Sequence, residues 1–360
     1  MKKTLLILSL VVSSNLVAAN IEIYGVGHMS ADGINNGTDS VFKIASNSSR
    51  LGFKANHDIS KTVNVFAQYE SGVDLTGQGY DDGNGVKAVQ SATFFTTVRE
   101  SYVGIKTNFG TLKAGVLPVV DTWIYDYNLF ADQVGDLGNT WGRSSTFVNR
   151  AGDSVSYWIP EFLEGLDASF TYLSDQSERY GQPQADGKEI LGYVAKGNYK
   201  INGLKFGLGY TNIKSDYTLG DSSDAVFTTS YSKDSFSVGA GYLNSKHQVE
   251  VSQTTTHHAY MLGGSYTMHE YTLKSQFSTI DDDTIDSDTK MLALGLDYKL
   301  SPETKLYVAY AKTSNGDNQS YLANNYGHGK SAYGAPAAGQ DPSAFSLGLV
   351  YTFGGSIYKD

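Results

Sequence analysis

Near its C-terminal end the chain carries the stretch Phe345-Ser346-Leu347-Gly348-Leu349-Val350-Tyr351-Thr352-Phe353. Its odd positions are all large apolar or aromatic residues, and its even positions are small or polar apart from the valine. Successive side chains of a β-strand point to opposite faces of the sheet, so this alternation predicts a strand with one apolar and one polar face. The stretch therefore favours a sheet that separates an apolar from a polar environment.

Similar alternation recurs from Leu204 to Tyr210, from Leu292 to Tyr298 and elsewhere along the 360 residues. In each case one face is aliphatic or aromatic and the other is small, polar or charged. We predict sixteen strands, which span residues 20–32, 41–57, 62–73, 93–106, 111–118, 150–159, 166–174, 190–200, 204–215, 224–232, 235–246, 256–268, 271–280, 289–300, 304–314 and 342–353.

The connections between these segments alternate in length. Short turns such as 201–203 and 301–303 follow one end of the strands, and long loops such as 119–149 and 315–341 follow the other. Periodicity alone would also fit a soluble sandwich. An even number of strands with tight turns at one rim and long loops at the other is typical of outer-membrane barrels, which close because lipid offers backbone groups no partner. The sequence predicts an all-β, 16-stranded antiparallel transmembrane β-barrel with an inward-folded constriction loop.

The N-terminus has the features of an export signal. Met1-Lys2-Lys3 precedes an apolar run from Leu5 to Val12, and Val17-Ala18-Ala19 supplies a cleavage site. The run is shorter than a membrane-spanning helix requires. We expect residues 1–19 to be a signal peptide, residues 20–353 the barrel, and residues 354–360 a short C-terminal tail.

Composition narrows the functional classes. The 39 glycines and 26 tyrosines, with only 6 prolines, favour strands over a helical bundle. No cysteine is present, and the formal net charge of −10 argues against nucleic acid as a partner. We predict no cofactor and no metal site. His257 and His258 are adjacent, so in a strand they would point to opposite faces.

A basic patch is predicted on the inner wall. In Ser49-Arg50-Leu51-Gly52-Phe53-Lys54, parity places Arg50 and Lys54 on the polar face, and the same rule places Arg99 inside. Arg150 begins a strand directly after the longest loop. These cations are candidate pore residues, although an equally simple interpretation is that they are solvated groups of the lumen. Parity would point Glu100 toward lipid, unless a subunit contact buries it or a local bulge reverses it.

The loop at 119–149 is long enough to have a function of its own. It contains the acids Asp121, Asp126, Asp132 and Asp136, interleaved with Trp123, Tyr125, Tyr127, Phe130 and Trp141. Folded into the barrel, it would set carboxylates opposite the arginines. Opposed charges across a narrow aqueous gap create a transverse field that favours polar solutes. For the loop 315–341, which includes Asp317, His328 and Lys330, two interpretations remain open: a second part of the constriction, or a mobile external loop.

Several of these segments carry a family resemblance. Tyr24-Gly25, Ser49–Lys54, Arg99–Lys106 with the following Phe109–Gly115, and Tyr351-Thr352-Phe353 resemble the trimeric general diffusion porins of Gram-negative outer membranes, in particular Vibrio-type major porins. The resemblance implies sixteen strands, a homotrimer embedded among outer-membrane lipid and lipopolysaccharide, and a third loop that narrows the pore.

Individual residues match the family unequally. Arg50 and Arg99 match basic wall residues of the family's eyelet, Arg150 matches less well, and the acids match only by lying in the constriction loop. Val26 and Val116 stand where many relatives carry a basic residue, which implies that this filter has a composition of its own.

The function predicted from these features is an outer-membrane general porin, a water-filled channel for passive diffusion of ions and small hydrophilic solutes. The alternative is a substrate-specific sugar channel with an aromatic track. An enzyme is not predicted, because the seven histidines are scattered and no nucleophile motif accompanies them. The acidic net charge leads us to expect weak cation selectivity.

Overall fold

The computed structural model describes residues 20–76, 95–119, 124–141, 149–178, 187–217, 220–250, 253–283, 287–328 and 336–358. The expected signal peptide, residues 1–19, lies outside this part of the chain. The strands are β1 (Asn20–Asn35), β2 (Ser40–Ser46), β3 (Arg50–Ser60), β4 (Val63–Val73), β5 (Phe95–Val98), β6 (Ser101–Thr107), β7 (Gly110–Pro118), β8 (Arg150–Trp158), β9 (Leu166–Leu173), β10 (Ile190–Ile201), β11 (Leu204–Ser215), β12 (Ser222–Lys233), β13 (Phe236–Glu250), β14 (Gln253–Met268), β15 (Tyr271–Asp282), β16 (Ser287–Lys299), β17 (Thr304–Asn315) and β18 (Ser343–Tyr358). A 3-10 helix, η1, spans Leu137–Asn139.

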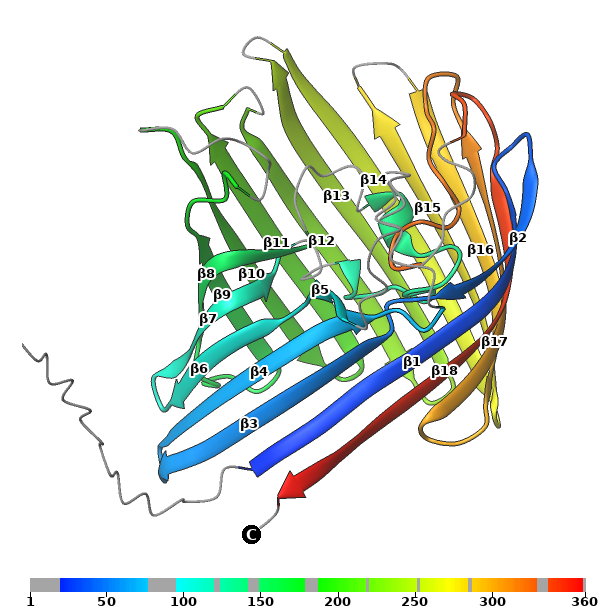
Figure 1. The fold of residues 1–360 in the computed structure, drawn as a ribbon. Helices are drawn as coiled ribbons and strands as arrows, with labels where there is room; N and C mark the ends of the chain where they lie inside the picture. The colour runs from blue at the N-terminus through cyan, green and yellow to red at the C-terminus, as the bar shows by residue number, and fades with distance from the viewer. Residues whose placement is uncertain are drawn as a thin grey trace, which may run out of the picture.

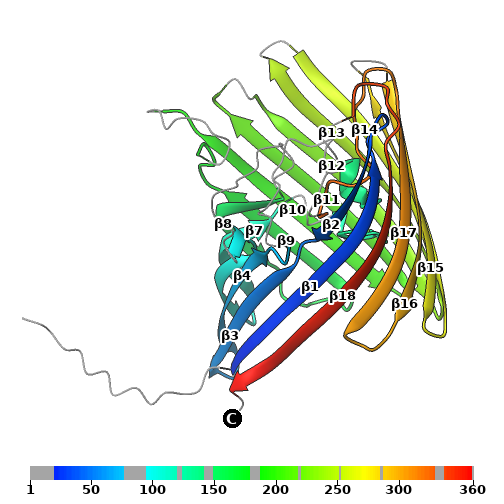
Figure 2. The same cartoon turned by 45° about the vertical axis from the view of Figure 1, so that its right-hand side comes forward.

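The strands form one closed antiparallel sheet (Figures 1 and 2). Neighbours in the chain are neighbours in the sheet, and β18 pairs with β1 from Asn35↔Ser343 to Ile21↔Tyr358 to complete the barrel. The eighteen strand segments amount to sixteen barrel strands, because β2 and β3 pair with successive halves of β1, and β5 and β6 pair with β4. The predicted fold class is confirmed.

Two predicted strands are interrupted. The segment expected at 41–57 is broken between β2 and β3, where Ser48 adopts a positive φ of 45°. The segment expected at 93–106 is broken at Arg99 and Glu100. Both breaks lie on the wall that carries the predicted basic patch, so the departures from regular pairing occur where the pore residues are held.

The outer face of the barrel is apolar. Leu208 and Leu273 are 64% and 63% exposed, and they alternate along their strands with residues that face the lumen. An outer face so rich in exposed apolar side chains is expected to lie in lipid and not in water. Among the described residues, no helix is both long and apolar enough to cross a bilayer.

The last strand is longer than predicted. β18 continues past Phe353 to Tyr358, with Gly354 opposite Tyr24 and Gly355 opposite Ile23. Residues 354–358, which were expected to begin a separate tail, therefore extend the barrel wall. β1 starts at Asn20 and is available as a partner over this whole length.

Candidate pore constriction

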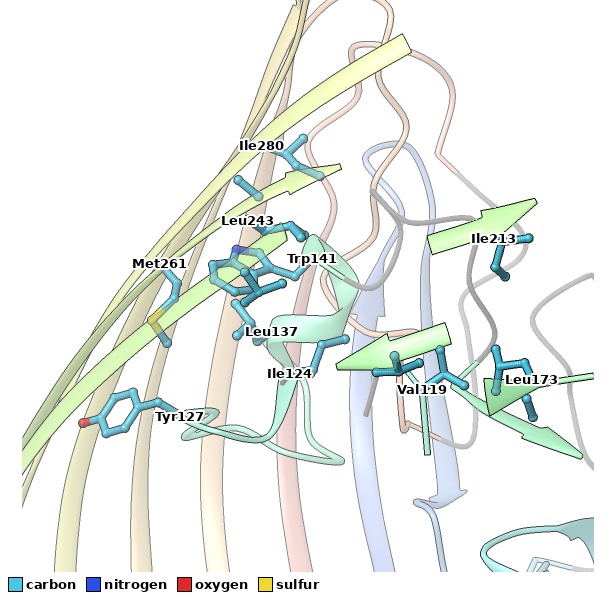
Figure 3. Packing of buried hydrophobic residues seen from close by; sticks show 14 of the residues in the cluster. Val119, Ile124, Tyr127, Leu137, Trp141, Leu173, Ile213, Leu243, Met261 and Ile280 are labelled. Atoms are coloured by element: carbon cyan, nitrogen blue, oxygen red, sulfur yellow. The ribbon is translucent and has the colours of Figure 1, made fainter. Parts of the chain in front are cut away.

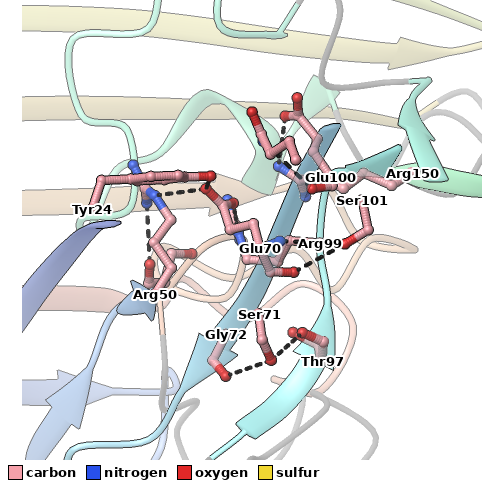
Figure 4. A network of polar contacts seen from close by, with 12 residues as sticks. Tyr24, Arg50, Glu70, Ser71, Gly72, Thr97, Arg99, Glu100, Ser101 and Arg150 are labelled. Atoms are coloured by element: carbon pink, nitrogen blue, oxygen red, sulfur yellow. Dashed lines mark hydrogen bonds and ion pairs between the residues drawn. The ribbon is translucent and has the colours of Figure 1, made fainter. Parts of the chain in front are cut away.

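Three arginines from separate strands gather on one wall of the lumen (Figure 4). Arg50 begins β3, Arg99 lies in the break between β5 and β6, and Arg150 begins β8. The buried Glu70 of β4 lies between the first two: its carboxylate is 2.5 Å from Arg99 Nε and 3.9 Å from Arg50 Nε. Tyr24 Oη also donates a hydrogen bond of 3.0 Å to Glu70. The predicted basic patch exists, but a carboxylate that sequence reasoning missed organises it.

Glu100 does not point toward lipid. Its carboxylate lies 3.8 Å from Arg150 Nη2. The expectation that parity points it toward lipid was wrong: Val103 and Ile105 of β6 face outward, so the alternation of β6 places Glu100 on the inner face with Tyr102. Lys54 lies on the same inner face as Arg50, at the edge of the cluster, with its Nζ 4.4 Å from the centre of the Tyr24 ring.

The loop between β7 and β8, residues 119–149, is here called L3. Its described part, 124–141, folds into the barrel and packs against the inner wall (Figure 3). Trp141 and Leu137, both 1% exposed, lie against Leu243 and Met261 of the wall. The wall leaves room for these side chains: a Cβ added at Gly241 would lie 2.6 Å from the Trp141 ring, and one at Gly239 would lie 2.4 Å from the Tyr127 ring.

The four predicted acids of L3 have different surroundings. Asp132 Oδ2 is 3.7 Å from Arg50 Nη1, so this acid of L3 contacts the arginine cluster. Asp126 was predicted to lie opposite the arginines, and that was wrong: it binds Lys196 and Lys205 at 2.8 and 2.7 Å, on another part of the wall. Asp121 lies outside the described residues.

Asp136 is also not a pore-lining group. It is fully buried and caps η1, and its carboxylate accepts hydrogen bonds from the side chain of Asn128 and the backbone N–H groups of Asp132 and Gly138. Burial, together with the nearby Asp132, raises the pKa of Asp136 to about 8. Burial also raises the pKa of Asp132, while Arg50 opposes that shift. Asp136 therefore shapes the loop, whereas Asp132 is the acid of L3 that contacts Arg50.

The loop between β17 and β18, residues 316–342, is here called L8, and its residues 321–328 also fold inward. Tyr321, Leu322 and Ala323 are buried, and the Gly135 N–H of L3 donates to the Ala323 carbonyl at 2.8 Å. Ser48 Oγ donates to the Gly327 carbonyl at 3.0 Å. Of the two interpretations left open by the sequence, the structure supports a second part of the constriction.

A second charged cluster on the wall resembles the one around Asp126. Asp297 of β16 lies 3.0 Å from both Lys274 and Lys305. Lys274 also donates to the Leu129 carbonyl and to Gln133 of L3, each at 2.9 Å. Sequence reasoning did not single out these lysines, although the parity that found Arg50 would have placed Lys205, Lys274 and Lys305 on the inner face.

Comparison with known proteins decides the family. The family model described as "Gram-negative porin" matches residues 4–318. The chain belongs to the Gram-negative porin family. Outer membrane porin protein 32 of Delftia acidovorans is 26% identical over 383 aligned positions, which cover 98% of this chain and 100% of that protein. Major outer membrane protein P.IB of Neisseria meningitidis is 27% identical over 57% of each chain.

Solved structures share the fold of this porin. The anion-selective porin from Comamonas acidovorans superposes with a TM-score of 0.75 at 20% identity, and covers 93% of this chain and 100% of its own. OmpT of Vibrio cholerae superposes with a TM-score of 0.66 at 18% identity, and covers 93% of this chain and 98% of its own. This porin is an outer-membrane channel for passive diffusion.

Proposed function

We propose that this porin conducts ions and small hydrophilic solutes through the gap between the arginine cluster and the inward loops, and that this gap sets its size limit. The observation that carries the proposal is the Arg50–Asp132 pair, in which a wall cation and a loop carboxylate meet at 3.7 Å and so border the aqueous path beside them with opposite charges. A field between fixed opposite charges orients polar solutes and disfavours apolar ones. Arg99, Arg150 and Lys54 extend the basic side.

Liposome swelling with neutral sugars of increasing size tests this function. We expect rates that fall smoothly with solute size and rise linearly with concentration, because diffusion through an open aqueous gap does not saturate. Saturation by one sugar would instead support a specific channel, and absence of swelling with any solute would contradict both.

The sugar-channel alternative has little support from the aromatic residues of L3. Phe130 and Trp141 are 0% and 1% exposed, so their rings pack against the wall and do not line the lumen. Tyr127 is 9% exposed and lies against Gly239. Among the described aromatic residues of L3, Tyr125 is the one with substantial exposure, at 38%. A single exposed ring does not make a track.

We further propose that the pore prefers anions, contrary to the expectation from net charge. At the constriction three arginines face Glu70, Glu100 and Asp132, so the charges balance. Two more clusters each hold two lysines around one aspartate, and Lys205 and Lys305 are 24% and 37% exposed. Fixed charges in a narrow lumen act on every passing ion, whereas charges of the outer loops are screened within about 10 Å at 0.1 M salt.

The similar porin from Comamonas acidovorans is described as anion-selective, which agrees with this proposal. The reversal potential across a planar bilayer in a KCl gradient checks it. We expect the sign that corresponds to chloride permeation, and a smaller value at 1 M salt, where screening shortens to about 3 Å. A reversal potential of the opposite sign at low salt would contradict the anion preference while leaving the channel function intact.

We also propose that the porin is a homotrimer. One solved relative is described as a trimer form of OmpT. On the outer face of β3, β4, β6 and β7, small side chains leave a shallow apolar groove of about 640 Å³, lined by Ala55, Ala67 and Ala114 among others. Small residues let two barrels approach closely. Lipid and lipopolysaccharide would cover the rest of the apolar band, and residues 1–19 would be removed on export.

A further inference from the structure

The side chain of Asn139 joins the two inward loops. Asn139 lies at the end of η1 in L3 and is 1% exposed. Its Oδ1 accepts hydrogen bonds from the backbone N–H groups of Asn325 at 2.8 Å and Tyr326 at 2.7 Å. Its Nδ2 donates to the Ala323 carbonyl at 3.2 Å. A carboxamide offers an acceptor and two donors at one end, so this one side chain satisfies three backbone groups of L8.

The surfaces of the two loops also fit closely around this amide. A Cβ added at Gly138 would lie 2.1 Å from the Tyr326 ring, so the ring rests directly on the backbone of L3. The Gly135 N–H adds a second backbone contact to the Ala323 carbonyl. The contact between the loops is therefore specific in geometry, and its buried polar groups are unfavourable when left without hydrogen-bond partners.

The other side of L8 is fixed to the barrel wall. His328 Nε2 lies 3.1 Å from Asp32 Oδ2 of β1, and both side chains are fully buried. Ser48, in the break between β2 and β3, donates to the Gly327 carbonyl. Residues 321–328 thus connect the β1–β3 wall to L3, and we call this segment the strut.

The strut lies directly against Asp132. A Cβ added at Gly327 would lie 2.6 Å from Asp132 Oδ1, so little space separates L8 from that carboxylate. Apolar packing on the wall reaches this part of L3 too, because Phe130 and Val134 lie in one buried cluster with wall residues such as Ala293. The wall therefore supports one side of the tip, and the strut covers the Asp132 carboxylate from another side.

We propose that Asn139 is a positioning residue that couples the strut to L3 and thereby sets the width of the constriction. This inference rests on the proposed role of the constriction in limiting solute size. Without the amide, the N–H groups of Asn325 and Tyr326 lose this partner, while the Ala323 carbonyl keeps only the Gly135 N–H. The strut is then free to move away from L3, because water can satisfy the exposed N–H groups.

The test compares Asn139→Ala with wild type in planar bilayers and in liposome swelling. We expect single-channel conductance to rise by about 1.5-fold or more, because the conductance of an aqueous pore grows with its open cross-section. Open-channel noise and the largest permeant sugar should increase as well. Deletion of residues 318–338 removes most of L8 and should give the largest conductance, against which the smaller increase in Asn139→Ala is compared. Asn139→Asp keeps the acceptor but not the donor, and should fall between Asn139→Ala and wild type.

Asn198→Ala is the matched control. Asn198 is a buried lumen asparagine whose amide donates to Asp167 on the neighbouring strand at 3.1 Å, so its removal vacates a similar volume at the wall. We expect wild-type conductance and size limit. Heat-modifiable electrophoretic mobility should be the same for all variants, which separates a change in position from a failure to fold.

Wild-type conductance and size limit in a correctly folded Asn139→Ala variant would overturn the proposal. If that variant does not assemble, Ser48→Ala provides a second test, because it removes the Gly327 contact at the other side of the strut. An unchanged size limit in Ser48→Ala would then count against a strut. Lack of any conductance in wild type would contradict the proposed function instead, so the two failures are distinguishable.

Discussion

Glu70 is the residue that sets the charge of the arginine cluster. It is 7% exposed and lies between Arg50 and Arg99, where its removal would leave two cations without their shared partner. We predict that Glu70→Gln increases the permeability ratio of chloride to potassium. A unit charge about 8 Å away in water changes an ion's energy by about 0.5 kcal/mol, or about twofold for each ion.

Reversal potentials measured at 0.1 M KCl check this prediction. Asp39→Asn, in the exposed connection between β1 and β2, is the control and should leave the ratio near wild type. The prediction fails if Glu70→Gln shifts selectivity toward cations or leaves it unchanged.

Asp136 gives L3 a dependence on pH. Its pKa is raised to about 8 by burial and by Asp132, above the usual value near 3.9. A carboxyl with a raised pKa supports the folded loop while it is protonated. That support is complete below about pH 4 and is lost as the pH rises through about 8. We expect open-channel noise to increase between pH 6 and pH 9, and Asp136→Asn to abolish this dependence. Equal pH dependence in both proteins would contradict the assignment.

For single residues, the sequence predicted the inner face correctly where strand alternation is regular. It did not predict the charge partners, because these lie far away in the sequence. Arg50 could be placed on the inner face because alternate residues of a strand share a face. Arg99 shares its parity with the outward-facing Val103 and Ile105, and it reaches the lumen because the chain leaves regular pairing between β5 and β6. Their partner Glu70 lies on another strand, and the register that brings it to Arg99 depends on an interruption that no local pattern announces. Asp126 was placed in the right loop but opposite the wrong wall, since loop composition does not determine which residues a loop contacts.

At the scale of elements, L3 is held by apolar residues on the inner wall. Trp141 lies over Gly241, where an added Cβ would be 2.6 Å from the ring. We predict that Gly241→Ala displaces Trp141 and loosens L3, because overpacking a close contact costs about 1–3 kcal/mol. Single-channel conductance should rise, and tryptophan fluorescence should shift to longer wavelength as the indole meets water.

Gly33→Ala provides the comparison for this variant. A Cβ at Gly33 meets no atom within 4 Å, so conductance and fluorescence should remain those of wild type. An unaltered emission spectrum in Gly241→Ala would mean that the wall glycine is not needed to seat L3.

The strands and the inward fold of L3 were predictable, but the wall residues that L3 contacts were not. Alternation found β11 at its observed bounds, because a strand between lipid and lumen must alternate along its whole length. The place where L3 packs does have a signal in the sequence, because apolar residues such as Ile190, Leu243 and Ile280 point into the lumen and require cover. The extension of β18 to Tyr358 was missed because glycines 354 and 355 interrupt the alternation.

At the scale of the whole molecule, the apolar groove on the outer face leads us to predict where the subunits of a trimer meet. The groove around Ala67 and Ala114 needs small side chains if another subunit packs there. We predict that Ala67→Trp reduces the proportion of trimer in detergent by tenfold or more, since overpacking of about 1.4 kcal/mol already corresponds to a factor of about ten. Unheated electrophoresis and light scattering in detergent measure this proportion.

Another part of the outer wall supplies the control. Ala195→Trp lies in a groove of similar volume, about 670 Å³, on the outer face of β9–β13, and should leave the trimer intact. Loss of trimer in both variants, or in neither, would contradict the assignment of the subunit interface.

The central claim is that solutes pass through an open gap beside Arg50. Because the chain has no cysteine, Arg50→Cys introduces a single reactive site at that point. Planar-bilayer recordings during addition of a bulky, water-soluble methanethiosulfonate reagent test the claim directly, with Phe42→Cys on the outer face as the control. We predict a stepwise loss of current for Arg50→Cys and none for Phe42→Cys. Unchanged current after complete modification of Arg50→Cys would contradict the account.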